Sequence, residues 1–246
     1  MSLSLPEVRI PDRMTGGRNA RRGYQRGWGL QFGGLGDRIV LDPVFLRAGE
    51  LARGRTVVDL MRLMNIFLII RFFFPKLSAH DIVEFGAYRG GSAMFMASCL
   101  KDLFPLARVY ALDTFAGMPP TGELDMHKPG DFRDTSFDEV QAAARRANLT
   151  NLTFVKGRFA QSFPPVAANA AAFGLAHIDC DIYDAVRYCQ DAVWPKMCAG
   201  GYVVYDDATT SSCLGATQAV EELIIERRLH SEQVWPHVVL RAGLTQ

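Results

Sequence analysis

The fold of this chain is decided by two segments, LAHIDCDIYD (175–184) and GGYVVYDDA (200–208), each an apolar run that ends in paired aspartates. Short apolar runs of this kind predict buried strands. Asp206 follows Asp179 by 27 positions, and a helix-like stretch at 183–193 lies between them. One strand–helix–strand crossover has this length, so we expect two parallel strands. If these strands are neighbours, their ends lie about 5 Å apart.

Four carboxylates would then converge at one edge of the sheet, those of Asp179, Asp181, Asp206 and Asp207. Carboxylates this close together cannot all ionise cheaply unless a cation joins them. Because the candidate ligands are hard oxygens, with no cluster of His or thiolate beside them, Mg²⁺ is the expected ion, ahead of Mn²⁺ and Ca²⁺. The sequence therefore predicts a divalent-metal site.

The same aspartates have other interpretations. D-x-D also occurs in glycosyltransferases that hold a metal–nucleotide-sugar complex, and D-x-D-x-[TV] opens phosphatases with an aspartyl nucleophile. Tyr183 stands where the phosphatase motif has Thr or Val, and the motif follows the fourth predicted strand rather than the first. Six residues (208–213) separate Asp206-Asp207 from the next predicted helix, which argues against a capping role. His177 and Cys180 are interpreted as buried structural side chains.

Composition limits the function classes. The 246 residues are 49% hydrophobic with a formal net charge of +1, which suits a globular protein and argues against binding nucleic acid through bulk charge. Residues 1–55 hold ten Arg and no Lys against five acidic residues, so this segment is +5 and the remainder −4. We interpret 1–55 as a partly flexible arm or lid, with an RNA- or lipid-contacting arm as the alternative, and 56–246 as the main domain.

Strand-like and helix-like segments alternate along most of the chain. Helices are expected at 42–53 and 56–74, the second ended by Pro75, and a turn at Gly200-Gly201. Strands are then expected at 81–85, 108–112, 152–156, 175–179, 202–205 and 238–242, and further helices at 91–103, 136–147, 166–172, 183–193 and 214–228. This alternation predicts an α/β fold with a central, mostly parallel sheet and helices on both faces.

Two features bear on where the protein works. The run LMNIFLIIRFFF (63–74) is apolar, but it is twelve residues long and holds Asn65 and Arg71, whereas a membrane span needs about 20 residues. A core helix is therefore expected, with a dimer face as the alternative. The five cysteines form no C-x-x-C pair, and no signal peptide is evident, which indicates reduced thiols in the cytoplasm.

A glycine-rich segment, IVEFGAYRGGSA (82–93), runs from a predicted strand into a predicted helix. Its glycines permit tight turns, and the helix start offers free amides to a polar ligand. The spacing G-x-x-x-G-G is not the dinucleotide fingerprint. The acid-x-Gly form of Glu84 to Gly86 is instead associated with S-adenosylmethionine loops, although any strand–helix junction uses glycine.

Two later segments would complete such a nucleotide site. Asp113 ends the second predicted strand, where an acid accepts both hydroxyls of a ribose, and the alternative is a cap or loop aspartate. Gly157, Arg158 and Phe159 follow the third strand and would shape an adenine pocket. For Phe159 a place in the core is an equal alternative.

These segments together resemble the macrocin O-methyltransferase family, metal-dependent sugar O-methyltransferases that use S-adenosylmethionine in natural-product biosynthesis. The motifs that carry the resemblance, over roughly residues 80–230, are VEFGAYRGGSA, LDTFAGMP, VKGRFAQSFP, HIDCDIYDA and GGYVVYDDATTSSCLGATQAVEE. The resemblance implies a Rossmann-like class I methyltransferase domain over 56–246. The first 55 residues look unlike the family's usual start, so the acceptor sugar is left open.

The resemblance also implies roles for individual residues. Asp179, Asp206 and Asp207 match magnesium ligands, Asp181 matches a proposed general base, and the loop 115–135 matches a substrate lid. The cofactor-binding residues expected from the motifs and the resemblance together are Glu84, Gly86, Ala87, Tyr88, Arg89, Ser92, Asp113, Thr114, Ser136, Gly157, Arg158, Phe159 and Asp179.

We therefore predict a Mg²⁺-dependent O-methyltransferase acting on a hydroxyl of a sugar or glycosylated natural product. A catechol-like phenol is the alternative acceptor, because vicinal aromatic hydroxyls satisfy the same metal geometry. A D-x-D nucleotide-sugar enzyme and a binding module without catalysis are further alternatives, and the four aspartates argue against the last. The expected partner is a small-molecule acceptor in the cytoplasm, with neither nucleic acid nor membrane, and a homodimer is expected if 63–74 is an interface.

Overall fold

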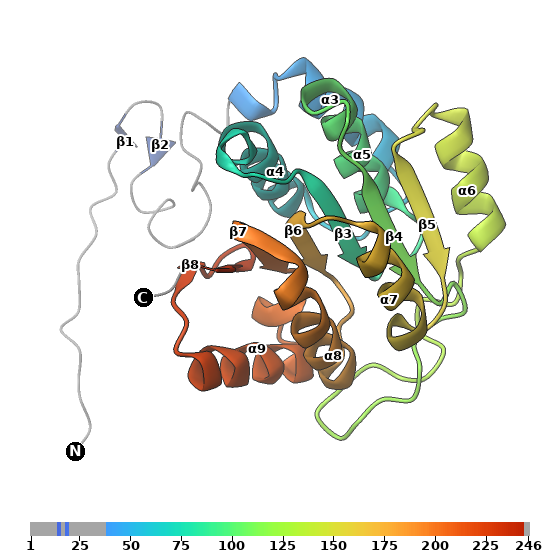
Figure 1. Ribbon diagram of the computed structural model, residues 1–246, viewed down its shortest axis with the longest axis vertical. Helices are drawn as coiled ribbons and strands as arrows, with labels where there is room; N and C mark the ends of the chain where they lie inside the picture. Colours follow the sequence, from blue (N-terminus) through green and yellow to red (C-terminus); the bar gives the residue numbers. More distant parts are fainter. Residues whose placement is uncertain (1–13, 16–17, 20–37, 244–246) are drawn as a thin grey trace.

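The computed structural model describes residues 14–15, 18–19 and 38–243, and its centre is a seven-stranded sheet (Figure 1). The strand order is β5-β4-β3-β6-β7-β9-β8. Pairs from β5 to β7 are parallel, whereas β7–β9 and β8–β9 are antiparallel. The strands are β3 (Asp81–Phe85), β4 (Val109–Asp113), β5 (Leu152–Lys156), β6 (Phe173–Ile178), β7 (Met197–Tyr205), β8 (Ser231–Gln233) and β9 (Val238–Arg241). The predicted α/β fold with a mostly parallel sheet is confirmed.

Helices cover both faces of the sheet because successive residues of each strand point to opposite sides. Ile82 and Val204 belong to one core, with α3 to α6, while Val83 and Val203 belong to the other, with α7 to α9. Figure 1 shows α8 and α9 below the sheet and α3 to α5 above it. The helices are α3 (Pro43–Ala52), α4 (Leu60–Leu68), α5 (Gly91–Leu103), α6 (Phe137–Arg146), α7 (Phe159–Asn169), α8 (Tyr183–Val193) and α9 (Leu214–Arg227).

The segment after α3 differs from the single helix expected at 56–74. α4 begins only at Leu60, because the Asp59 side chain caps it by accepting a backbone hydrogen bond of 2.9 Å. The path then continues as a π-helical turn, η2 (Ile69–Phe73), and a 3₁₀ turn, η3 (Phe74–Lys76). Pro75 lies at the start of that last turn, where a missing N–H costs little, so the prediction that it ends the helix was wrong.

Two other predicted elements were wrong. The helix expected at 166–172 begins at Phe159 and contains Pro164 and Pro165. Its buried face explains this, since Phe163 packs on Phe85 with ring centroids 5.1 Å apart, and burial of this size outweighs the local cost of proline. Gly200 and Gly201 form no turn between elements but lie inside β7, where its register with β6 shifts.

The N-terminal helices belong to the core on one face of the sheet. Phe45 of α3 contacts Phe67 of α4 and Phe95 of α5 edge-on, with ring centroids 5.3 and 5.5 Å apart. Ile66 and Ile70 are fully buried, so the prediction of a core helix within 63–74 is confirmed. Within the described residues, no helix is both long and apolar enough to cross a membrane.

The arm predicted at 1–55 lies largely outside the described residues, which omit 1–13, 16–17 and 20–37. Its described parts are α3 and a pair of two-residue antiparallel strands, β1 (Met14–Thr15) and β2 (Arg18–Asn19). The division of the chain at residue 55 stays a prediction.

Candidate active site

A cleft of about 610 Å³ opens where β3, β4, β6 and β7 end. The chain runs outward from β3 to β4 and β5 on one side, and from β6 to β7 on the other. The junction of β3 and β6 is therefore the topological switch point, the place where open α/β sheets bind ligands. Gly86 follows β3 and Asp179 follows β6, so both lie at this junction.

Three aspartates come together at the ends of β6 and β7. The parallel register pairs Ile178 with Tyr205, which places Asp179 beside Asp206, and the Asp206 N–H donates to the Ile178 carbonyl at 3.0 Å. One carboxylate oxygen from each of Asp179, Asp206 and Asp207 lies within 4.8 Å of the others. The neighbouring parallel strands predicted from the sequence are confirmed, and the three carboxylates lie near enough to one another to be candidate ligands of a single ion.

The electrostatics of this cluster favour a cation. Burial, and then the charges of Asp206 and Asp207, raise the pKa of Asp179 well above its usual value. Burial and the neighbouring carboxylates raise the pKa of Asp207 in the same way. For Asp206, burial acts upward, but hydrogen bonds from His177 and His237 lower its pKa overall. A divalent ion would relieve the repulsion among these carboxylates, and hard oxygens suit Mg²⁺, so the residues present fit this metal.

Asp181 lies beside the three aspartates rather than among them. Its backbone adopts a left-handed conformation with φ of 62°, and its N–H donates to Asp207 Oδ2 at 2.9 Å. Its carboxylate Oδ1 lies 3.5 Å from His127 Nε2 and accepts from the Cys213 thiol at 3.6 Å. Burial is the main cause that raises the pKa of Asp181. Cys180, between the two aspartates, turns into the core as predicted.

Seven of the predicted cofactor-binding residues line the same cleft: Gly86, Tyr88, Asp113, Thr114, Arg158, Phe159 and Asp179. Asp113 accepts the Tyr88 N–H at 2.8 Å on one oxygen and the Phe115 N–H at 2.7 Å on the other. Gly86 has φ of +99°, and a Cβ there would lie 1.6 Å from the Asp179 carbonyl oxygen. The loop after β3 is thus a cradle packed directly on the end of β6, which only glycine allows, and Gly86 itself lines the cleft.

The other six predicted cofactor residues are not among those that line the cleft. Glu84, Ala87 and Ser92 are buried. Glu84 Oε1 contacts His177 Nδ1 at 3.0 Å, while its Oε2 is buried without a hydrogen-bond partner. The remaining three occupy the loops and helix ends around the cleft: Arg89 pairs with Asp134, Ser136 caps α6, and Gly157 follows β5 with φ of +150°. Their roles toward a cofactor stay predictions.

The loop 115–135, predicted as a lid, forms one wall of the cleft. Met118, Pro119, Pro120, His127 and Phe132 line the cleft from this loop. Asp125 anchors the loop by accepting the Tyr183 N–H at 2.9 Å, at the first residue of α8. It fits closely there, because a Cβ on Gly215 would lie 2.1 Å from the same carboxylate oxygen.

Sequence reasoning missed four polar residues around the aspartates: Arg62, Asn65, His127 and His237. Arg62 Nε lies 3.5 Å from Asp206 Oδ2, and His237 Nε2 lies 2.9 Å from Asp206 Oδ1. Asn65 contacts the other nitrogen of His237 at 2.9 Å. The one available signal was that Asn65 is the polar residue within the apolar run 63–70.

Comparison with known proteins identifies the family. The model of the macrocin-O-methyltransferase (TylF) family matches residues 52–232. The chain belongs to this family. The predicted class, an O-methyltransferase, is therefore confirmed, and the phosphatase and glycosyltransferase interpretations of the aspartates are set aside.

Individual relatives have low sequence identity to this chain but match most of its length. An 8-demethyl-8-(2,3-dimethoxy-alpha-L-rhamnosyl)-tetracenomycin-C 4'-O-methyltransferase from Streptomyces olivaceus is 27% identical over 186 residues, 71% of this chain and 70% of that protein. Demethyldecarbamoylnovobiocin O-methyltransferase from Streptomyces niveus is 27% identical over 70% of this chain and 68% of its own. The solved O-methyltransferase NovP shares the fold, with a TM-score of 0.68 and 23% identity over 85% of this chain and 95% of that one.

Proposed function

We propose that this enzyme transfers the methyl group of S-adenosylmethionine to a hydroxyl of a glycosylated small molecule, with Mg²⁺ held by Asp179, Asp206 and Asp207. The observation that carries the proposal is that the aspartate cluster and the Gly86 cradle share one cleft, with Asp179 common to both. The relatives support a small natural product as the acceptor, since one is named for a rhamnosyl tetracenomycin, which bears a sugar, and another for demethyldecarbamoylnovobiocin.

The residues after β3, β4 and β5 would bind the cofactor. Asp113 Oδ2 accepts one backbone N–H and keeps a lone pair for a ribose hydroxyl, while Oδ1 accepts the Phe115 N–H and, at 3.5 Å, the Thr114 hydroxyl. Gly86 lines the cleft and lets the loop after β3 pack directly on the end of β6, where any side chain would collide. Phe159, packed edge-on against Phe85 at 5.4 Å, offers an aromatic surface to an adenine.

The acid cluster would supply the chemistry at the acceptor. A bound Mg²⁺ stabilises negative charge on an acceptor hydroxyl and so lowers the pKa of that hydroxyl. Asp181 is placed to take the proton, because it borders the three ligands and burial has raised its pKa toward that of a useful base. His127 Nε2, 3.5 Å from Asp181, faces that carboxylate from the loop 115–135.

The loop 115–135 would exclude water from the reaction. It contributes proline and aromatic side chains to the cleft and is fastened to α8 by Asp125. Exclusion of water strengthens the electrostatic interactions around the transferring methyl group and prevents hydrolysis.

Two wider predictions belong to this proposal. The five cysteines are buried and unpaired, which supports a reducing cytoplasm. Phe72 and Phe73 of η2 are 46% and 39% exposed, which supports the expected homodimer through this segment. Sedimentation of the full chain measures the second, and a monomer at assay concentration contradicts it.

The proposal is tested with radiolabelled S-adenosylmethionine and a panel of acceptors that bear sugars, catechols or single hydroxyls. We expect label in a sugar-bearing product, loss of transfer with EDTA, and recovery when Mg²⁺ is returned. Transfer that persists in EDTA contradicts the metal-assisted mechanism, and transfer to catechols alone contradicts the sugar acceptor. Asp181→Asn should bind S-adenosylhomocysteine normally while losing turnover, which separates a base from a binding residue.

A further inference from the structure

Asp206, one of the proposed magnesium ligands, is held by buried side chains from three parts of the chain. His237 Nε2 lies 2.9 Å and His177 Nε2 3.5 Å from its Oδ1, and Arg62 Nε lies 3.5 Å from its Oδ2. Both imidazoles are fully buried, and Asp206 itself is 5% exposed. The orientation of this carboxylate is therefore set by its neighbours rather than by solvent.

The contact with Asn65 decides how His237 acts. Asn65 Nδ2 lies 2.9 Å from His237 Nδ1. An amide NH₂ only donates, so Nδ1 is the acceptor and the ring carries its proton on Nε2. That proton is directed at Asp206 Oδ1. The hydrogen bonds thus run in one direction, from Asn65 through His237 to Asp206 Oδ1, whereas the Arg62 guanidinium lies near Oδ2.

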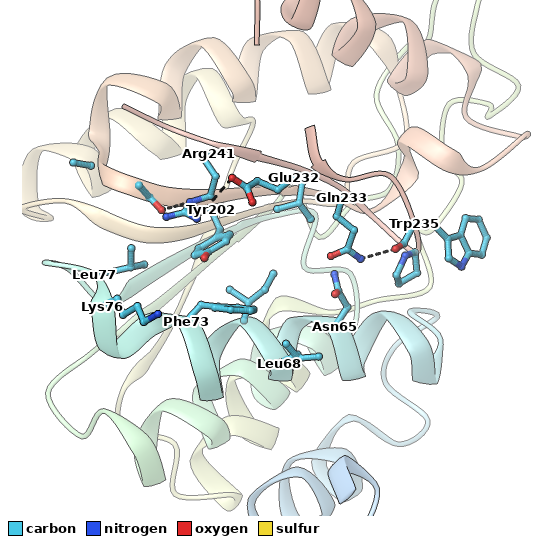
Figure 2. Close-up of a pocket in the computed structure, with 15 residues that line it drawn as sticks. Asn65, Leu68, Phe73, Lys76, Leu77, Tyr202, Glu232, Gln233, Trp235 and Arg241 are labelled. Carbon is cyan, nitrogen blue, oxygen red and sulfur yellow. Dashed lines mark hydrogen bonds and ion pairs between the residues drawn. The ribbon is translucent and has the colours of Figure 1, made fainter. Parts of the chain in front are cut away.

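Both residues come from outside the strand–helix alternation that builds the cleft. Asn65 is on α4, and His237 immediately precedes β9 on the antiparallel side of the sheet. Figure 2 shows Asn65 projecting from α4 toward the segment of Gln233 and Trp235, which leads to His237. The family match ends at residue 232, before His237.

A second cavity, of about 770 Å³, borders Asn65 and the residues just before His237 (Figure 2). Asn65, Trp235 and Pro236 line it, so packing around the segment that carries His237 is incomplete on that side. The His237 imidazole is itself fully buried, and the hydrogen bond from Asn65 fixes which ring nitrogen faces Asp206.

We propose that Asn65 and His237 are positioning residues of the magnesium site, which orient Asp206 so that one oxygen faces the ion. The proposal rests on the proposed function, because it assumes that Asp206 is a ligand. Partners of this kind fix the direction of a metal ligand, and their loss typically lowers metal affinity about 10- to 100-fold.

The test is calorimetric titration of the full chain with Mg²⁺, alongside titration with S-adenosylhomocysteine and thermal unfolding. Asn65→Leu removes the donor to His237 and leaves the imidazole in place. His237→Phe removes the donor to Asp206, whereas His237→Gln keeps an N–H donor of similar reach. Asn151→Leu is the matched control, since Asn151 also donates one hydrogen bond of 2.9 Å, to the Ala97 carbonyl, and has no part in the site.

We expect Asn65→Leu and His237→Phe to bind Mg²⁺ about tenfold or more weakly, with S-adenosylhomocysteine affinity unchanged. His237→Gln should restore most of the affinity, and Asn151→Leu should lose stability alone. Equal Mg²⁺ affinity in Asn65→Leu and the wild type overturns the inference, as does a His237→Gln variant no better than His237→Phe. A wild type that binds no Mg²⁺ overturns the proposed function instead, and this proposal with it.

Discussion

Replacement of Gly86 by Ala tests whether the glycine loop and the aspartate cluster form one site. A Cβ at Gly86 would lie 1.6 Å from the Asp179 carbonyl oxygen, so the two must separate by about 1.4 Å to reach the 3.0 Å that real Cβ atoms respect. The obstacle is backbone at the end of β6, not the tip of a flexible side chain. The loop or the end of β6 must therefore move, and Asp179 moves with the latter.

Gly86→Ala should lose folding stability for two reasons, and the two losses add. A non-glycine residue at positive φ costs roughly 1–2 kcal/mol, and overpacking costs roughly 1–3 kcal/mol more. At roughly 2–4 °C per kcal/mol, the melting temperature should fall by roughly 4–20 °C. Gly54→Ala is the matched control, because Gly54 also has positive φ, +71°, but its Cβ would meet nothing within 4 Å. Gly54→Ala should therefore lose only the stability that a non-glycine residue costs at positive φ.

The assay combines thermal unfolding with calorimetric titration of S-adenosylhomocysteine and Mg²⁺. Gly54→Ala should bind both ligands like the wild type. Gly86→Ala should bind both more weakly and should transfer methyl roughly 100-fold more slowly, because a displacement of about 1 Å in a preorganised site has that effect on rate. If Gly86→Ala binds both ligands as tightly as Gly54→Ala, the shared cradle is refuted.

Three further predictions concern the base, the metal and the lid. Burial raises the pKa of Asp181, and a general base acts only when it is ionised. The kcat/KM should therefore fall as the pH decreases through a pKa above that of an ordinary aspartate. A pH profile without this acidic decrease contradicts the role of Asp181 as the base. Mg²⁺ at 100 times its Kd should add about 2.7 kcal/mol and raise the melting temperature by roughly 5–10 °C, measured against an equal ionic strength of NaCl. In Gly215→Ala the new Cβ would lie 2.1 Å from Asp125 Oδ1 and should detach the loop 115–135 from α8. The acceptor KM should then rise about tenfold, with S-adenosylhomocysteine affinity unchanged. An unaltered KM would show that Asp125 does not anchor this loop.

Much of the fold follows from local patterns. β3, β5, α5 and α8 occur within the predicted limits, because each is a short segment whose own periodicity or flanking turn marks its ends. The prediction failed where tertiary packing overrides local rules. α7 extends through Pro164 and Pro165 because Phe163 is buried against the sheet.

The residues of the candidate site also fall into those that the sequence predicts and those that it does not. Asp179 and Asp206 could be placed from sequence because each directly follows a strand, and parallel neighbours bring such residues to one edge. Asn65, His127 and His237 could not, since they come from a preceding helix, a long loop and the segment just before β9, an antiparallel strand between β7 and β8. Their proximity depends on how distant segments pack, and a single sequence carries no pattern for that.

The most direct test of the central claim is the rate of labelled methyl transfer as a function of Mg²⁺ for the wild type and Asp207→Asn. The substitution removes one charge of the cluster and keeps an oxygen to accept the Asp181 N–H. We predict Mg²⁺-dependent turnover in the wild type and a loss of roughly 100-fold or more in the variant, with S-adenosylhomocysteine affinity unchanged. Full Mg²⁺-dependent activity in Asp207→Asn would contradict the assignment of these aspartates as the metal site.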